Sequence, residues 1–327
     1  MAINSRLYRA GVFFLAAAVL FTAYNFHPVV RMISPFLPCD GGETNLVHIL
    51  NPNISVRIEL PSAQALNTTG VIRSLMQAIP GTVPYNVTWV TALYDIGRSD
   101  RSYHFQYKQW FIETLKIPLP VIVFCRGEDA KWIGMARRGQ HPTLIIGEDQ
   151  IPLEVIVQTV REIIPFMRRG RTAVEWSNER YIPLQFSKAI WLQRAMELNP
   201  FHSHTFFWVD AGASRFFTGR FTLLQAASLD SDRLYISGTE YLPLVDTMPS
   251  YSIIGSQLSF FMGGVFGGRA AAVARASAAL LEILHSEMLS KRRVDNEQVA
   301  FGLMYKAHRD WFHVIDRVAN GCYVVCL

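Results

Sequence analysis

Apolar runs alternate with amphipathic segments along most of this chain. Unbroken apolar runs of strand length, rich in β-branched and aromatic residues, predict four strands, at 87–93, 120–125, 143–146 and 206–209. Aromatic residues with helical spacing predict a helix at 102–115, and further helices are expected at about 153–164 and 184–198. Because strands and helices alternate, we expect an α/β domain with a mostly parallel central sheet that helices cover on both sides.

The pattern loosens beyond the fourth predicted strand. We expect a helix over Phe216–Ala227, a short strand over Arg233–Ser237 and an alanine-rich helix from Arg269 to about Leu289. Charged residues interrupt the last helix, which argues against a membrane span there. Two glycine pairs, Gly263-Gly264 and Gly267-Gly268, precede it. They either let the backbone approach a sugar or phosphate at the helix N-terminus, or form a tight turn with positive φ.

The N-terminus has the pattern of a membrane anchor. Residues 10–26 are uncharged and mostly apolar, and Arg6 and Arg9 precede them, which predicts a cytosolic N-terminus. A cleaved signal peptide is the alternative, although its apolar core is usually shorter. We therefore divide the chain into a cytosolic tail (1–9), a transmembrane signal anchor (10–27), a lumenal stem (28–85) and a main domain (86–327).

The predicted stem has features of a lumenal segment. It is expected to be partly folded, with a strand near 55–60 and a short helix near 71–78. Three N-glycosylation sequons begin at Asn53, Asn67 and Asn86, and a short apolar span suits the thin membranes of the early secretory pathway. Together these features predict a single-pass type II membrane protein of the Golgi or endoplasmic reticulum.

Charge and cysteine content bear on nucleic-acid binding, zinc binding and disulfide pairing. The net charge is +5, and its densest clusters, 168–171 and 291–293, lack interleaved aromatic residues, so we expect no nucleic-acid binding. No Cys-x-x-Cys pair occurs, which argues against a structural zinc site. For the four cysteines, a Cys39–Cys125 bridge, a Cys322–Cys326 bridge and buried free thiols all remain open.

An acid stands directly after the fourth predicted strand. Asp210 is followed by Ala211 and Gly212, whose small size lets a ligand come close. Ligands of open α/β sheets bind beyond the carboxyl ends of the strands, where a carboxylate can hold a divalent cation. The alternative is that Asp210 caps a turn, since Asp-x-Gly is common turn chemistry.

Several motifs, taken together, are similar to one protein family. They are Thr91–Arg98, Tyr181, Lys188, Asn199–Phe201, Trp208–Gly212, Gly263–Gly268 and Asp295–Gln298. In this order they resemble the HtrL/YibB/WlaTC family of proposed glycosyltransferases, from roughly residue 87 to the C-terminus. The resemblance implies a GT-A-like fold that binds a nucleotide-sugar donor at the carboxyl end of the sheet. It names neither the donor nor the acceptor.

What the resemblance implies is a membrane-anchored glycosyltransferase that moves a sugar from a nucleotide-sugar donor to a glycan, glycoprotein or glycolipid acceptor. The expected donor-binding residues are Tyr94, Asp95, Arg98, Lys188, Asp210, Gly212, Gly263 and Gly264. Among them, Lys188 and Arg98 would neutralise charge on a diphosphate leaving group. Many GT-A enzymes hold Mn²⁺ or Mg²⁺ with Asp-x-Asp, and Gly212 replaces the second acid here. Asp210 alone would then ligate the cation, directly or through water. The alternative is that Asp210 hydrogen-bonds the ribose or sugar hydroxyls with no metal present.

An inverting transferase also needs a general base for the acceptor hydroxyl. Glu297 is our first candidate and Asp295 the second, because both lie on a polar loop that enters the last predicted helix. A retaining mechanism would assign them to acceptor binding instead. They could equally be ordinary acids at a helix N-terminus, which the helix dipole favours.

Two other functions compete with glycosyl transfer. A lumenal lectin-like protein, or an inactive transferase homologue, would bind sugar without turnover. The joint presence of Asp95, Lys188, Asp210 and Glu297 argues against an inactive homologue, because loss of activity erodes such polar sets. A phosphotransferase with an aspartate nucleophile is disfavoured, since Gly212 removes its second acid.

Overall fold

The computed structural model describes residues 44–51, 54–61, 85–138, 141–167, 174–216, 222–224, 229, 232–256, 258–315 and 324–326. The expected tail, the anchor at 10–27 and the helix near 71–78 lie outside these ranges. None of the helices in the described ranges combines the length and apolar character that a membrane crossing requires.

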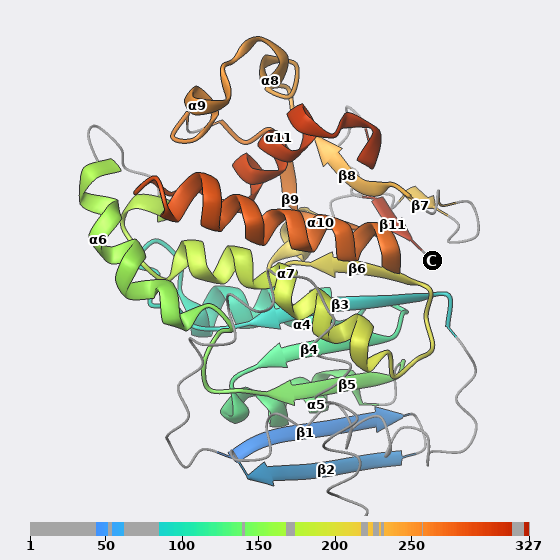
Figure 1. Ribbon diagram of the computed structural model, residues 1–327. Helices are drawn as coiled ribbons and strands as arrows, with labels where there is room; N and C mark the ends of the chain where they lie inside the picture. Colours follow the sequence, from blue (N-terminus) through green and yellow to red (C-terminus); the bar gives the residue numbers. More distant parts are fainter. Residues whose placement is uncertain are drawn as a thin grey trace, which may run out of the picture. The chain divides into compact units, whose positions relative to one another are not determined.

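Nine strands in the described ranges form one sheet, in the order β10-β8-β9-β6-β3-β4-β5-β1-β2. Their bounds are β1 (Thr44–Asn51), β2 (Ile54–Pro61), β3 (Val87–Leu93), β4 (Val121–Cys125), β5 (Thr143–Gly147), β6 (Thr205–Val209), β8 (Leu234–Gly238), β9 (Phe261–Arg269) and β10 (Phe312–Ile315). Strands β6, β3, β4 and β5 are mutually parallel and lie side by side in Figure 1. The predicted α/β class and mostly parallel centre are confirmed.

The strands predicted from apolar runs are confirmed at β3, β4, β5 and β6, and the short strand predicted at 233–237 is β8. Every residue of β4, β5 and β6 is buried, as expected for strands covered on both faces. The strand expected near 55–60 is β2. It pairs with β1, which in turn pairs antiparallel with β5, so this hairpin extends the sheet beyond β5.

Helices cover the two faces of the sheet (Figure 1). On one face, α4 (Lys108–Thr114) and α5 (Ala130–Arg137) supply Phe111 and Ile133 to a core with Trp89, Val121 and Ile145. Side chains of a strand alternate between faces, so the intervening residues point to the other side. There α7 (Tyr181–Leu198) packs against α10 (Ala270–Glu282) and covers β3 and β6.

The observed helices depart from the predictions at their ends. The helix expected at 102–115 begins as a π-turn, η3 (Tyr103–Tyr107), before α4. The helix α6 (Val157–Met167) continues through Pro165, where we expected it to stop. Only Phe166 and Met167 follow Pro165, so the proline lies in the last turn of the helix. The alanine-rich helix becomes a π-helix, η9 (Ile283–Leu289), after α10.

One further prediction is wrong, and one alternative that the sequence left open is excluded. The helix expected over Phe216–Ala227 contains β7 (Thr222–Leu224), a strand that pairs with β11 (Val324–Cys326). The Cys39–Cys125 bridge is not formed, because Cys125 is a free, buried thiol at the end of β4. Burial raises the pKa of that thiol.

The glycine pairs lie within β9, so the tight-turn interpretation does not hold. β9 runs antiparallel between β6 and β8. A Cβ atom at Gly267 would lie 2.2 Å from the carbonyl oxygen of Phe206, and one at Gly268 would lie 2.8 Å from that of Arg233. These two glycines are needed because the neighbouring backbones approach β9 closely.

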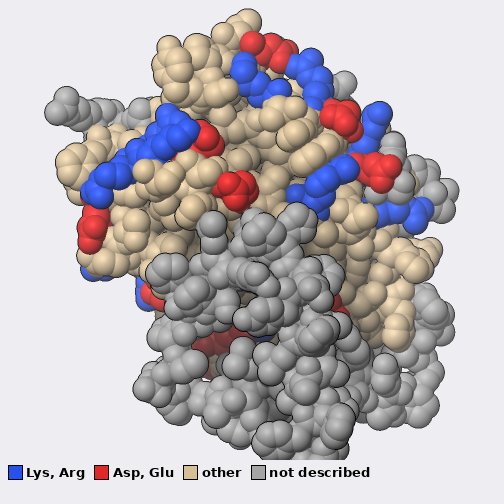
Figure 2. Space-filling model, in the orientation of Figure 1, with Lys and Arg blue, Asp and Glu red and all other residues tan. Residues whose placement is uncertain are grey.

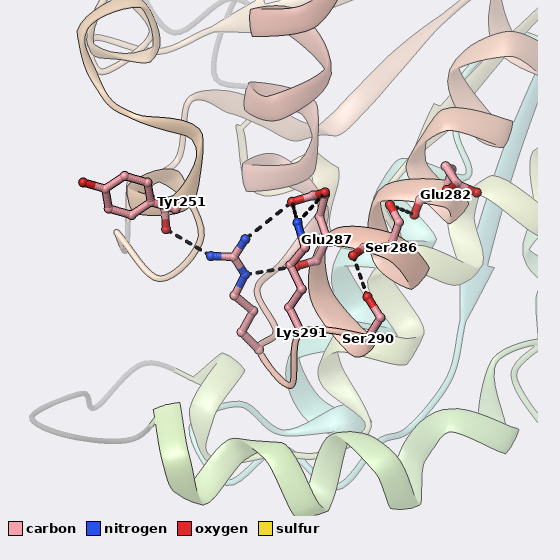
Figure 3. Close-up of polar contacts among 7 residues, drawn as sticks. Tyr251, Glu282, Ser286, Glu287, Ser290 and Lys291 are labelled. Atoms are coloured by element: carbon pink, nitrogen blue, oxygen red, sulfur yellow. Dashed lines mark hydrogen bonds and ion pairs between the residues drawn. The ribbon is translucent and has the colours of Figure 1, made fainter.

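Charges of both signs are interspersed over the described part of the face in Figure 2, and no extended field of one sign covers it. The basic cluster 291–293 has a structural use (Figure 3). Lys291 Nζ lies 2.7 Å from Glu287 Oε1, while Arg293 donates to the carbonyl oxygens of Glu287 and Tyr251. These bonds fix the turn after η9 against α9 (Ser250–Ile253).

Candidate functional site

A cleft opens where β3 and β6 end, at the carboxyl edge of the parallel strands. The space between its walls, open mouth included, is about 800 Å³. Among the residues that line it, six belong to the predicted set: Tyr94, Asp95, Arg98, Lys188, Asp210 and Gly212. This position agrees with the general rule for open α/β sheets.

Matching periodicities place Asp210 against Lys188. Trp208 and Asp210 are two residues apart at the end of β6, so their side chains leave the strand on the same face. Lys188 and Trp191 are three apart on α7, on one side of the helix. Trp191 stacks on Trp208, with ring centroids 5.8 Å apart, and Lys188 Nζ lies 2.9 Å from Asp210 Oδ1. The side chains of α7 therefore pack directly against those at the end of β6.

The Asp210 carboxylate is held firmly but stays accessible. Its Oδ1 atom accepts the indole N–H of Trp208 at 2.7 Å as well as the Lys188 contact. Its backbone N–H donates to the carbonyl of Gly264. The side chain is 36% exposed, so the carboxylate can still reach a ligand in the cleft.

Lys188 is enclosed by three acceptors. Its Nζ lies 2.7 Å from Glu297 Oε1, 2.9 Å from Asp210 Oδ1 and 3.1 Å from the carbonyl oxygen of Gly263. An ammonium group has three N–H donors, and these acceptors use all of them. Burial lowers the pKa of Lys188, but the two carboxylates more than offset this, so the pKa is raised.

Glu297 is the buried member of this cluster. It opens α11 (Glu297–Ala307), and Asn296 caps the helix by accepting from Gln298 N and Val299 N. The Glu297 side chain is 2% exposed and does not line the cleft, and its Oε2 atom has no hydrogen-bond partner among the described residues. Burial raises the pKa of this carboxyl, while Lys188 opposes the rise and Asp210 adds to it.

The first glycine pair makes room for the two carboxylates. A Cβ atom at Gly263 would lie 2.2 Å from Glu297 Oε1, whereas one at Gly264 would lie 3.6 Å from Asp210 Oδ2, an ordinary contact. Neither glycine is among the residues that line the cleft. We therefore assign Gly263 to the support of the ion cluster.

Three arginines stand on the cleft wall. Arg98 donates to both carboxylate oxygens of Asp100 and to the hydroxyl of Tyr107, and Arg101 lies 3.5 Å from the same Asp100. Arg215 rests on the Trp110 ring, 4.5 Å from its centroid. Sequence analysis found Arg98 but not Arg101 or Arg215, because single arginines in loops give no periodic or motif signal.

The other predicted residues have ordinary structural contacts. Tyr94 stacks on Trp191 and forms part of the cleft floor, and burial raises the pKa of its hydroxyl. Asp95 lines the cleft but also accepts from Gly97 N, which is an Asx-turn contact. Asp295 lies outside the cleft, where its carboxylate accepts from Gly255 N and Asn296 N.

The residues present offer little to a divalent cation. Within the described ranges, no group of three His, Cys, Asp or Glu side chains is arranged to hold a metal ion. Asp210 Oδ1 is already shared by Trp208 and Lys188. Asp210 Oδ2 is the oxygen left for a cation, and an ammonium group lies beside it. The expected Mn²⁺ or Mg²⁺ ion therefore does not fit these residues as a resident cofactor.

Comparison with known proteins agrees with the motifs that meet at this site. Residues 85–321, more than two thirds of the chain, match the profile of HtrL_YibB, described as "Bacterial protein of unknown function". The chain belongs to the HtrL_YibB family. No curated protein matches it. In this HtrL_YibB member, the motif residues Tyr181 and Lys188 of α7 and Asp210 after β6 line one cleft.

Proposed function

We propose that this HtrL_YibB protein is a glycosyltransferase that takes a sugar from a nucleotide-sugar donor bound in the cleft. The observation that supports this proposal most is the fixed, half-exposed carboxylate of Asp210, facing a cleft whose wall carries Arg98, Arg101 and Arg215. A donor of this class combines sugar hydroxyls with a diphosphate. A carboxylate binds the former, and guanidinium groups bind the latter.

The charges that develop during sugar transfer suit a carboxylate at the sugar and guanidinium groups at the diphosphate. The bond between the anomeric carbon and the diphosphate oxygen breaks, and the bond to the acceptor oxygen forms. The sugar passes through an oxocarbenium-like transition state while the leaving diphosphate gains negative charge. Arg98, Arg101 and Arg215 stand where such charge would be stabilised. Asp95 and Asp210 are the two carboxylates among the lining residues, so either can accept a hydrogen bond from a bound sugar.

Lys188 and Glu297 have a different role in this proposal from the one predicted by the sequence. Lys188 was expected to bind the leaving group and Glu297 to act as the base. The Lys188 donors are all used within the cluster, and Glu297 lies behind Lys188. We therefore assign both as positioning residues that fix Asp210. Burying an ion pair rarely adds stability over apolar packing, which favours a functional reason for this one.

The acceptor and the cell compartment remain predictions from the sequence. A glycan, glycoprotein or glycolipid acceptor follows from the proposed class of enzyme. The membrane anchor and the Golgi or endoplasmic reticulum location follow from residues 1–27, outside the described ranges. Asn86, the third sequon, is exposed just before β3.

Donor turnover tests the proposed function. The protein without residues 1–27 would be incubated with a panel of nucleotide-sugars, with thermal stabilisation and nucleotide release as readouts. Binding to the folded state raises its stability by RT ln(1 + [L]/Kd), so a true donor registers near saturation. We expect one donor to stabilise the protein and release its nucleotide. A lectin-like protein or an inactive homologue would give stabilisation without release.

The variant for this test is Asp210→Asn, which keeps an oxygen for Trp208 and Lys188 but loses the charge. We expect nucleotide release to fall about 100-fold or more with little change in folding, as for loss of a group that stabilises a transition state. Glu179→Gln, which removes a surface partner of Arg161, is the matched control. Equal release by Asp210→Asn and wild type would contradict the proposed role of Asp210.

A further inference from the structure

The Asp210 carboxylate already has a cationic partner within the protein, Lys188, which it shares with Glu297. The Lys188 ammonium lies at ion-pair distance from Oδ1, and the Trp208 N–H shares the same oxygen. A dication at Oδ2 would stand close to that ammonium, and repulsion between like charges opposes its binding. Lys188 cannot turn away, because Glu297 and the carbonyl of Gly263 hold it from the other side.

No other carboxylate of the described cleft completes a cation site. Glu297 is buried behind Lys188 and does not line the cleft. Asp95 lines it, but one of its oxygens accepts from Gly97 N. A site for Mg²⁺ or Mn²⁺ that relied on the protein would thus have oxygen ligands from Asp210 and Asp95 at most. Magnesium sites commonly use one or two carboxylates together with substrate phosphates, but here Asp210 Oδ1 is already paired with Lys188.

Positive charge on the cleft wall comes instead from guanidinium groups. Arg98, Arg101 and Arg215 all line the cleft, and Asp100 is the acid that bridges the first two. Burial and the neighbouring Arg101 both lower the pKa of Arg215, as expected where positive charges crowd together. Arginine stays charged at every physiological pH, and its planar fork matches two phosphate oxygens at once.

We infer that Arg98, Arg101 and Arg215 form the diphosphate subsite of this cleft, and that diphosphate binding requires no divalent cation. The inference rests on the proposed function and specifies how the donor is held. Asp210, paired with Lys188, contacts the sugar end. The three arginines supply at the diphosphate end the positive charge that a metal ion provides in an Asp-x-Asp enzyme.

Calorimetric titration tests this inference. The protein without residues 1–27 would be titrated with uridine, guanosine, adenosine and thymidine diphosphates and with inorganic pyrophosphate, in EDTA and again in Mn²⁺. We expect the Kd of the best nucleoside diphosphate in EDTA to lie within about threefold of its value in Mn²⁺. Arg101→Gln should weaken binding about tenfold or more, the usual effect of losing a charge-assisted hydrogen bond. The Arg101 side chain is 34% exposed, so the variant is expected to fold.

Matched variants separate a bidentate subsite from general positive charge. Arg215→Lys keeps the charge but loses the fork, and should also weaken binding. Arg161→Gln removes an exposed arginine paired with Glu179 and should bind like the wild type. Unchanged binding by both Arg101→Gln and Arg215→Lys would overturn the inference.

The outcomes also separate this inference from the proposed function. Nucleoside diphosphate binding in Mn²⁺ but not in EDTA would overturn the inference and leave the proposed function standing. Pyrophosphate binding in EDTA, lost in Arg101→Gln, without binding of any nucleoside diphosphate would support the arginine subsite and overturn the nucleotide-sugar proposal. No binding of any probe under either condition would overturn both.

Discussion

At residue 263, the absence of a side chain lets a buried ion cluster form. The Glu297 carboxylate occupies the space where a Cβ atom would stand, and from there it reaches Lys188. Lys188 in turn holds Asp210 at the cleft. The position of the Asp210 carboxylate thus depends on Gly263, which does not itself line the cleft.

Gly263→Ala tests this dependence. The added methyl group must displace the Glu297 carboxylate or shift β9, so we expect a loss of about 1–3 kcal/mol in the free energy of unfolding. Urea denaturation would measure it. Gly264→Ala is the matched control, because its methyl group would meet Asp210 Oδ2 at an ordinary contact distance. Equal stability of the two variants would contradict the assignment of Gly263.

At the scale of elements, the beginning of α11 determines where Glu297 lies. The Asn296 side chain accepts two backbone N–H groups of the first turn, which fixes the start of the helix at Glu297. Asp295 holds the preceding loop through Gly255 N. Of the motif Asp295–Gln298, the first two residues therefore support the backbone and the third belongs to the ion cluster.

Removal of this cap has a predictable cost. Asn296→Ala should destabilise the protein by about 1 kcal/mol, because two helix N–H groups lose their acceptor. Asn296→Ser keeps an acceptor oxygen and should restore most of that stability. Urea denaturation of the three proteins would check this order. If Asn296→Ala is as stable as the wild type, the cap does not anchor α11.

At the scale of the whole molecule, the sheet continues beyond the part that defines the family. The HtrL_YibB match begins at residue 85, whereas β1 and β2 precede it and pair onto β5. Without them, β5 would present unpaired backbone groups at a sheet edge. Exposed edges of this kind promote pairing between molecules.

Truncation would show whether the hairpin protects this edge. A protein that begins at residue 85 should form oligomers or aggregates at concentrations where one that begins at residue 28 stays monodisperse. Size-exclusion chromatography with light scattering would measure the difference. Identical behaviour of the two proteins would mean that β5 needs no cover.

Much of the fold could be predicted because its signals are local. The strands β3, β4, β5 and β6 are continuous apolar runs, so neighbouring residues determine each of them. The wrong predictions come from competing interactions that are not local. Gly267 and Gly268 of β9 are required because neighbouring backbone lies too close for a Cβ atom there, and β7 forms by pairing with β11.

By itself, the sequence determined the family, the α/β class and the place of Asp210 at the end of a buried strand. Those conclusions need only motif order and residue period. Tertiary structure alone decided what Lys188 and Glu297 do, because 109 positions separate them and their contact depends on the packing of α7, β9 and α11. It also brought Arg101 and Arg215 to one cleft. Ion partners are chosen by proximity in space, and residue order along a chain does not encode that directly.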